Sequence, residues 1–195
     1  MINIGFNEFK RIHKKRINQV IYSSTKIKNE SFLINLINNF LKEKNSFVFE
    51  SVEKGKVRGR YTIFGKDPDK IWEFNNSKAY IVNKKKRKKI NGSPKKIIEK
   101  LIENFNFKVP KDIPPISSII SGYFSYDIIR YIENIPNKCK NDLRLPDVRL
   151  IRPNKLVIYD NIEKKIYFIV NCYKDKKIKN YKKTFIHIKK EILEL

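Results

Sequence analysis

Cysteine and histidine are both scarce in this sequence of 195 residues, which has two of each. Cys139 and Cys172 are too far apart to form the closely spaced pairs that metal sites use, and two cysteines do not make a disulfide framework. With His13 and His187 as the only histidines, a zinc site would lack ligands. We therefore expect a reduced compartment, and no metal or cofactor in this chain.

Long apolar runs are missing as well. The N-terminus has no apolar stretch of the kind found in signal peptides, because Asn, Glu and Lys interrupt it. No segment approaches the roughly 20 apolar residues that a membrane-spanning helix needs. These absences predict a cytoplasmic protein without a membrane association. A hydrophobic content of 41%, with 12% aromatic residues, is sufficient for a folded core.

The sequence also lacks the usual signatures of a self-contained enzyme. Nucleophile elbows, phosphate-binding loops and paired metal motifs are absent. Ser117, Ser118 and Ser121 are candidate nucleophiles, but neither histidine lies near them in the sequence. This pattern argues against a hydrolase.

Acidic residues are few: 20 Asp and Glu stand against 44 Lys and Arg, which gives a net charge of +24. The cations are spread along the chain, and only residues 84–89 form a block, which we expect in a turn before Asn91 and Gly92. The abundance of Lys, Asn, Ile, Phe and Tyr would also follow from A/T-rich codons. Solvated surface charge is therefore favoured over a nucleic-acid site, and nucleic-acid binding is kept as a second hypothesis.

Apolar periodicity predicts the main elements. Apolar residues recur at three-four spacing after Ser31 and again after Ser93-Pro94, which predicts two helices. Paired apolar runs predict hairpins around residues 75–77 and around Asp160-Asn161, and Asp67-Pro68 is expected to form a turn. Because hairpins outnumber strand-helix-strand units, we expect an α+β fold with mostly antiparallel, sandwich-like sheets and helices packed outside. A single domain over residues 1–195 is expected.

One predicted hairpin carries unusual polar residues. Glu50 and Ser51 end an apolar run, and Arg60 opens the next. If the two runs pair, a carboxylate, a hydroxyl and a guanidinium meet at one end of the sheet, and together they match the two charged groups of an amino acid. The alternative is an internal salt bridge from Glu50 to Arg58 or Arg60, since an unpaired charge is costly to bury.

Four ordered blocks carry a resemblance to a known family. Residues 49–51 and 59–68 resemble the LLES…GRYSFIG-x-DP segment of the large subunit (component I) of anthranilate synthase. Residues 122–136 resemble its GY-x-x-YD-x-VR-x-x-E-x-LP segment, residues 145–148 its LPDM and residues 157–161 its VVFDH. Aminodeoxychorismate synthases share the GY-x-x-YD block, but the Glu-Ser and Arg-Tyr pattern is closer to anthranilate synthase.

The resemblance implies an activity that this chain would not perform alone. The family's large subunit converts chorismate and ammonia to anthranilate and pyruvate with Mg²⁺, and a glutamine amidotransferase subunit (component II) supplies the ammonia. The chemistry belongs to a chorismate-binding domain C-terminal to the matched region, which we expect to be absent here. The chain is thus expected to be inactive by itself, and to pack against that domain within tryptophan biosynthesis.

The resemblance also implies a regulatory site. The N-terminal region of the family binds L-tryptophan as a feedback inhibitor, and its Glu-Ser pair corresponds to Glu50 and Ser51. Arg60 is our choice for the group that meets the ligand carboxylate, with Lys56 and Arg58 behind it. No catalytic residue is expected in this chain.

Some residues depart from the family pattern or allow another interpretation. Residues 116–121 replace a glycine-rich run, which restricts close backbone approach. Tyr126, Asp127 and Arg130 could be taken for catalytic groups, but an interior ion pair among packing aromatic residues is favoured. A degenerate relative that has lost its ligand and its partner remains an alternative.

Overall fold

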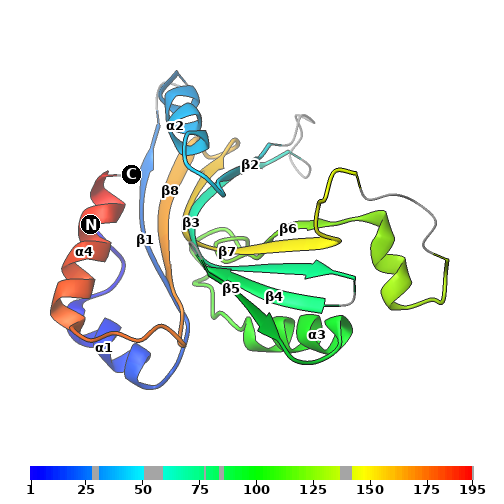
Figure 1. Cartoon of the computed structure of the whole chain (residues 1–195). Coiled ribbons are helices and arrows are strands. Elements are labelled where there is room, and N and C mark those ends of the chain that lie inside the picture. Colours follow the sequence, from blue (N-terminus) through cyan, green and yellow to red (C-terminus); the bar gives the residue numbers. More distant parts are fainter. Residues whose placement is uncertain (28–30, 51–58, 77, 84–85, 137–141, 195) are drawn as a thin grey trace. The chain divides into compact units, whose positions relative to one another are not determined.

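The computed structural model describes residues 1–27, 31–50, 59–76, 78–83, 86–136 and 142–194 (Figure 1). Its elements are α1 (Phe6–Lys14), β1 (Gln19–Lys26), α2 (Ser31–Leu41), β2 (Phe47–Phe49), β3 (Tyr61–Asn75), β4 (Lys78–Asn83), β5 (Lys86–Ile90), α3 (Pro94–Asn104), β6 (Ser121–Phe124), the 3₁₀-helix η1 (Tyr126–Tyr131), β7 (Val148–Asp160), β8 (Lys165–Cys172) and α4 (Tyr181–Glu194). The strand pairs β1–β8, β2–β3, β3–β4, β4–β5, β6–β7 and β7–β8 are antiparallel. The expected α+β class is confirmed, as are the expected hairpins.

The described residues group into two compact units. Unit 1 comprises Met1–Asp67, Phe107–Ile119 and Pro153–Leu195, and unit 2 comprises Pro68–Asn106 and Ile120–Arg152. β3 and β7 contribute residues to both units, and each strand passes from one to the other at a proline. Proline has no N–H to donate to a strand partner, so the ladder is interrupted at these positions. A single domain over residues 1–195 stays a prediction.

In unit 1, β8 lies between β1 and β7 and is buried on both faces. Its side chains alternate with the period of two that a strand imposes. Tyr167 and Ile169 pack into one cluster, whereas Ile166 and Val170 pack into clusters made with the helices. This explains why β8 is almost continuously apolar in sequence.

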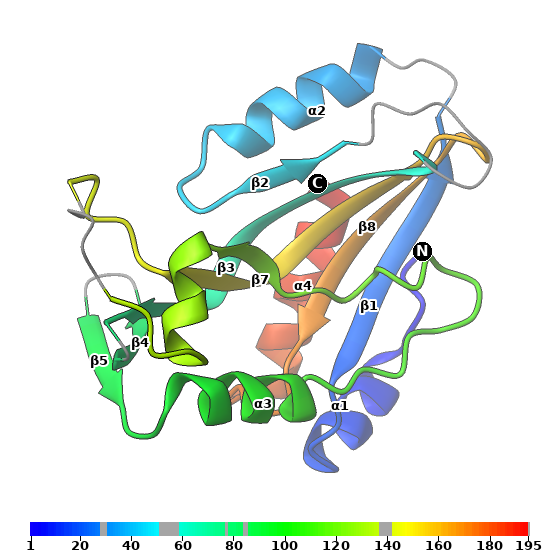
Figure 2. The same cartoon turned by 90° about the vertical axis from the view of Figure 1, so that its right-hand side faces the viewer.

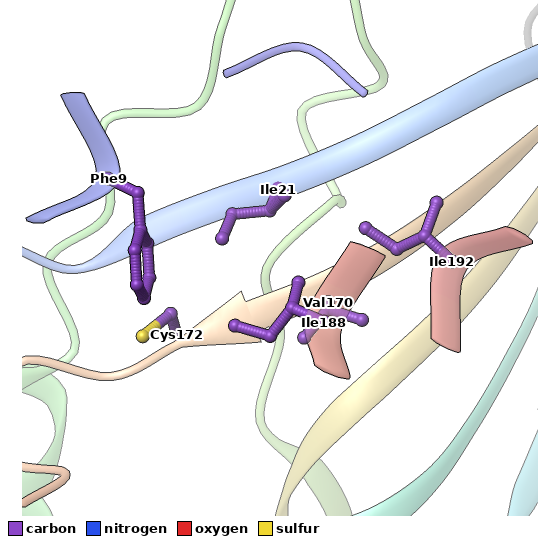
Figure 3. Close-up of a cluster of buried hydrophobic side chains, with 6 residues drawn as sticks. All are labelled: Phe9, Ile21, Val170, Cys172, Ile188 and Ile192. Carbon is purple, nitrogen blue, oxygen red and sulfur yellow. The ribbon is translucent and has the colours of Figure 1, made fainter. Parts of the chain in front are cut away.

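Helices cover one face of the unit 1 sheet. α1 and α4 pack on β1 and β8 through the cluster drawn in Figure 3, which consists of Phe9, Ile21, Val170, Cys172, Ile188 and Ile192. α2 packs on the neighbouring part of the unit, where Leu36 and Phe40 meet Phe64 and Val157. The expected outer position of the helices is thereby confirmed for this unit.

The proline-bearing segment 107–119 covers the other face. Figure 2 shows it crossing in front of β8 and β1, with α4 behind them. Its side chains Ile113, Phe107 and Val109 join a cluster with Leu156 and Ile169. Tyr22 on β1 donates a hydrogen bond to Asp112 of this segment, which fixes it to the sheet.

Unit 2 is organised around Trp72, Phe74, Ala79, Ile97, Val148 and Leu150. α3 supplies Ile97, and its first turn is capped by the Ser93 hydroxyl, which accepts a hydrogen bond from the Lys96 N–H at 3.5 Å. Arg152 donates to Asp69 from Nε at 2.7 Å, so an ion pair closes this unit beside the proline of β7. The start of α3 was predicted from Ser93-Pro94, whereas the ion pair between Asp69 and Arg152 was not predicted.

Three sequence-based expectations were wrong in detail. Asp67-Pro68 does not form a chain-reversing turn, since β3 continues through it with Asp67 at φ +54°. The described part of the lysine block, residues 86–89, lies in β5 rather than in a turn. Asp127 and Arg130 do form an ion pair within η1, but the Asp127 side chain is exposed rather than interior.

His13 generates a prediction about stability. It is 7% exposed on α1, and its Nδ1 lies 3.1 Å from the Tyr181 hydroxyl of α4. Burial, reinforced by the nearby cations Arg16 and Lys176, lowers the pKa of His13, although backbone hydrogen bonds partly oppose this. The unfolded chain therefore binds the proton more readily, so stability falls as the pH drops below the ordinary histidine pKa of about 6.5.

We expect the wild-type free energy of unfolding to fall between about pH 7.5 and 5.5, with a slope of at most about 1.4 kcal/mol per pH unit. Urea unfolding followed by circular dichroism at each pH measures it. His13→Phe should remove this dependence. The exposed His187 provides the control, and a His187→Gln variant that flattened the curve instead would contradict the assignment.

Candidate functional site

The predicted hairpin forms at the end of the sheet in unit 1. β2 pairs with β3 in the register Phe47↔Gly65, Val48↔Phe64 and Phe49↔Ile63. Glu50 follows directly after the last of these pairs and is exposed. Among the described residues, no hydrogen-bond or ion-pair partner is found for its carboxylate. Ser51, like Lys56 and Arg58, lies outside the described residues.

Arg60 opens β3 but does not pair with Glu50. Its Nε and Nη2 donate to the Asp160 carboxylate oxygen Oδ2 at 2.9 and 2.7 Å, and Nη2 also donates to Glu163 at 3.2 Å. The guanidinium lies 5.0 Å from the centre of the Tyr61 ring. The side chain is 36% exposed, and no acceptor for Nη1 occurs among the described residues. Arg60 is thus held in place while part of its guanidinium stays accessible.

Asp160 is the group that fixes Arg60. It is only 1% exposed, and its Oδ1 accepts hydrogen bonds from the backbone N–H groups of Ile162 at 2.9 Å and Glu163 at 3.1 Å. Burial alone would raise the pKa of this carboxyl, but the hydrogen bonds from Arg60, Glu163 and Ile162 outweigh it, so the pKa lies below its ordinary value. A buried, ionised carboxylate thereby ties the β7–β8 turn to the start of β3.

Asn161, in the same turn, adds further hydrogen bonds to the start of β3. Its backbone N–H donates to the Arg60 carbonyl at 2.8 Å, and its side-chain amide donates to the Gly59 carbonyl at 3.2 Å and the Thr62 hydroxyl at 3.3 Å. Gly59 has φ +78°, which glycine adopts at little cost. From the sequence, Asp160 and Asn161 were predicted to form a hairpin turn and to belong to a family block, but their bonds to the start of β3 were not predicted. The available signal was a polar pair that directly follows a buried apolar strand.

An apolar layer lies beside this polar sheet end. On α2, Phe40 is fully buried and meets Phe64 edge-on, with ring centres 5.9 Å apart. Tyr159, Val157 and Ile166 belong to the same cluster. The sheet end therefore combines a carboxylate, a fixed guanidinium and nearby apolar packing, which suits binding of a small zwitterion. Among the described residues, no three His, Cys, Asp or Glu side chains are grouped to hold a metal ion.

A separate recess of about 300 Å³ lies between α4 and the strands of unit 1. It is lined by Lys66, Lys155, His187, Lys190, Glu191 and Glu194. Lys66 is paired with Glu43 and Lys155 with Glu191, each at 2.7 Å. Because its lining has no apolar side chain and the partly buried Lys66 and Lys155 already have partners, this recess does not suit an aromatic amino acid.

The buried interaction of Asp160 with Arg60 yields a prediction about stability. Asp160→Asn should lower the free energy of unfolding by about 1–3 kcal/mol near pH 7, because a charged hydrogen-bond acceptor is lost. Since the folded-state pKa is depressed, this stabilisation is present above about pH 4 and disappears as the pH falls further, so variant and wild type should converge there. Urea unfolding at several pH values measures both effects.

The control for this prediction is Asp67→Asn, which removes an exposed carboxylate 3.8 Å from Lys155 in the same unit. We expect it to cost less than about 1 kcal/mol. Equal losses in the two variants, or a pH-independent deficit for Asp160→Asn, would show that Asp160 does not act as an ionised anchor.

Comparison with known proteins finds relatives among the anthranilate synthases. Anthranilate synthase component 1 of Cereibacter sphaeroides is 29% identical over 175 residues, which are 87% of this chain and 35% of the relative. The protein of the same name from Acetivibrio thermocellus is 32% identical over 141 residues, 72% of this chain and 28% of the relative. Anthranilate synthase alpha subunit 1, chloroplastic, of Oryza sativa subsp. indica is 31% identical over 147 residues, covering 68% and 26%. No family model matches the chain.

A solved structure agrees in fold. The crystal structure of anthranilate synthase component I from Streptococcus pneumoniae TIGR4 matches 83% of this chain and 34% of its own length, with a TM-score of 0.54 and 19% identity. The chain thus spans about a quarter to a third of the length of these proteins. Among the described residues, none of the helices is long and apolar enough to span a membrane. The chain belongs to the family of anthranilate synthase component I.

Proposed function

We propose that this chain is the N-terminal regulatory part of a cytoplasmic anthranilate synthase component I, and that it binds L-tryptophan at the sheet end described above. The observation that carries the proposal is that one sheet end of unit 1 holds an exposed carboxylate, with no partner among the described residues, and a guanidinium fixed by a buried aspartate. The Glu50 carboxylate and the Ser51 hydroxyl would both accept hydrogen bonds from the ligand ammonium. Arg60 would donate from Nη1 to the ligand carboxylate.

The chemistry of component I is assigned to the part that the chain does not match. There, chorismate and ammonia would give anthranilate and pyruvate, with Mg²⁺ and with ammonia from a glutamine amidotransferase subunit. The described residues offer no cluster for Mg²⁺, so no catalytic step is assigned to them. Tryptophan binding at Glu50 would act on that distant chemistry by favouring one state of component I, a coupling of about 1–3 kcal/mol in typical cases.

Calorimetric titration with L-tryptophan tests the proposed site, both on this chain and on its complex with the rest of component I. Loss of one charge-assisted hydrogen bond should weaken binding roughly 10- to 100-fold in Glu50→Gln. Glu43→Gln removes a carboxylate of the same unit that contacts Lys66, and should bind like wild type. Wild-type affinity in Glu50→Gln would place the ligand elsewhere, and no binding even in the complex would remove the regulatory role.

One observation favours a second candidate, nucleic-acid binding. Lys14, Lys15 and Arg16 at the end of α1 are exposed, as are Lys176 and Lys177 before α4. The two segments are joined, because the Lys174 N–H donates to the Asn18 side-chain oxygen at 2.8 Å. They therefore form one cationic surface in unit 1, of the kind that contacts phosphates.

Titrating generic duplex and single-stranded DNA across salt concentrations decides this candidate. We expect no binding at about 150 mM salt, because solvated charge without base-reading groups gives only weak, salt-sensitive attraction. Absence of binding at about 50 mM salt would remove the candidate. Tight binding that persists at higher salt and is lost in Lys15→Glu/Lys176→Glu would instead support it.

A further inference from the structure

Two of the described strands in unit 2 have an unpaired edge, and these edges differ sharply in chemistry. β5 pairs with β4 and exposes four consecutive cations, residues 86–89. Such charge on an edge strand discourages other chains from pairing with it. Among the described strands, β6 pairs only with β7, and its exposed residues are Gly122, Tyr123 and Phe124. The β6 edge thus lacks the protection that β5 has.

β6 and the residues that precede it carry no charge. Residues 113–126 contain no Lys, Arg, Asp or Glu, although a third of the chain is charged. This is the longest uncharged stretch in the sequence. Within this stretch the exposed residues are Pro115, Gly122, Tyr123, Phe124 and Tyr126, so four of the five lie on β6 or shortly after it. The lack of charge at these four exposed positions favours a surface that a partner covers.

The same region gathers exposed apolar side chains. Of seventeen large hydrophobic side chains that stand exposed among the described residues, seven lie between residues 123 and 145. Tyr126 is 90% exposed, Ile132 77% and Leu143 74%, and the others are Tyr123, Phe124, Ile135 and Leu145. We call these seven side chains the β6–η1 surface. Isolated soluble domains rarely expose so many apolar side chains in one region. Such a concentration is typical of an interaction site.

The β6–η1 surface is held in place by hydrogen bonds to Asp147. The Asp147 carbonyl accepts from the Ser125 N–H at 2.8 Å, and its carboxylate accepts from the Tyr131 hydroxyl at 2.6 Å and the Asn76 N–H at 3.0 Å. These bonds bring both ends of η1 against the segment that carries Leu145. A rigid surface loses little conformational freedom when a partner covers it.

Close backbone packing reinforces the anchor. Gly122 has φ +154°, and a Cβ atom there would lie 1.9 Å from the Arg149 carbonyl oxygen on β7. Ile128 and Tyr131 of η1 pack on the unit 2 core, while Tyr126 and Ile132 remain outside. One side of η1 is thus packed on the core of unit 2, and the other side is exposed.

We propose that the β6–η1 surface is the docking surface for the remaining part of component I. This inference rests on the proposed function. The relatives are about three to four times as long as the segment they share with this chain, so component I contains a large further part that this segment can contact. The surface also carries the Gly122-Tyr123 and Leu145-Pro146 motifs that resemble the family. An apolar strand edge beside exposed aromatic side chains fits a folded polypeptide that buries apolar area and can add a strand to β6.

Charge-introducing variants test the proposal. Tyr126→Asp and Ile132→Asp alter side chains that are already exposed, so both should fold, and unchanged urea unfolding verifies this. Ile102→Asp makes the same change at an exposed isoleucine of α3 in the same unit. The probe is the rest of component I from the same genome, made as a separate polypeptide. Its Kd for this chain is measured by interferometry, and hydrogen exchange of the β6 amides is followed.

We expect each of the two variants to weaken the complex at least tenfold, the control to bind within about twofold of wild type, and the β6 amides to become protected on binding. A wild-type complex that both variants form equally well would overturn this inference and leave the proposed function standing. No wild-type complex would overturn both. Self-association of the chain that both variants abolish, without binding of the component I polypeptide, would assign the surface to a second copy instead.

Discussion

The sheet end of unit 1 depends on one buried carboxylate. Asp160 stays ionised while almost fully buried, because Arg60 and two backbone N–H groups of its own turn neutralise the cost of its burial. Its neighbour Asn161 holds the backbone on either side of Arg60. The turn between β7 and β8 thus sets where β3 begins, a hundred residues earlier in the chain. The bonds from Arg60 to Asp160 therefore set the position of Arg60 for any ligand that binds at this sheet end.

Asp147 has a comparable position in unit 2. Like Asp160 it lies at one end of β7 and accepts hydrogen bonds from a distant side chain and from backbone N–H groups, although its backbone partners lie in other segments whereas those of Asp160 belong to its own turn. The strand β7 is therefore bounded by two aspartates, each of which organises irregular structure around itself. In both units the polar anchor sits next to the surface that we propose to be functional: amino-acid binding beside Asp160 and partner docking beside Asp147.

Much of this architecture could be predicted from local patterns. The helix starts at Ser31 and Ser93 and the hairpins at residues 75–77 and 160–161 follow from periodicity and turn residues. Asp67-Pro68 misled because a left-handed aspartate and a proline are also compatible with a distorted long strand. The partner of Arg60 could not be predicted, since Asp160 is far away in sequence and only the fold brings them together. For the same reason the sequence predicted a binding site at Glu50 and Ser51, but it could not decide which basic residue would meet the ligand carboxylate.

The pairing of β1 with β8 has a consequence for how the chain is made. Gln19 of β1 pairs with Cys172 of β8, so the first strand of the sheet can pair only after the last described strand has been made. At typical rates of synthesis, on the order of ten seconds or more separate the appearance of these two strands on the ribosome. During that interval the apolar side chains of β1 have no sheet to join. Unit 1 is thus completed only once β8 has been synthesised, and β1 stays without its strand partner until then.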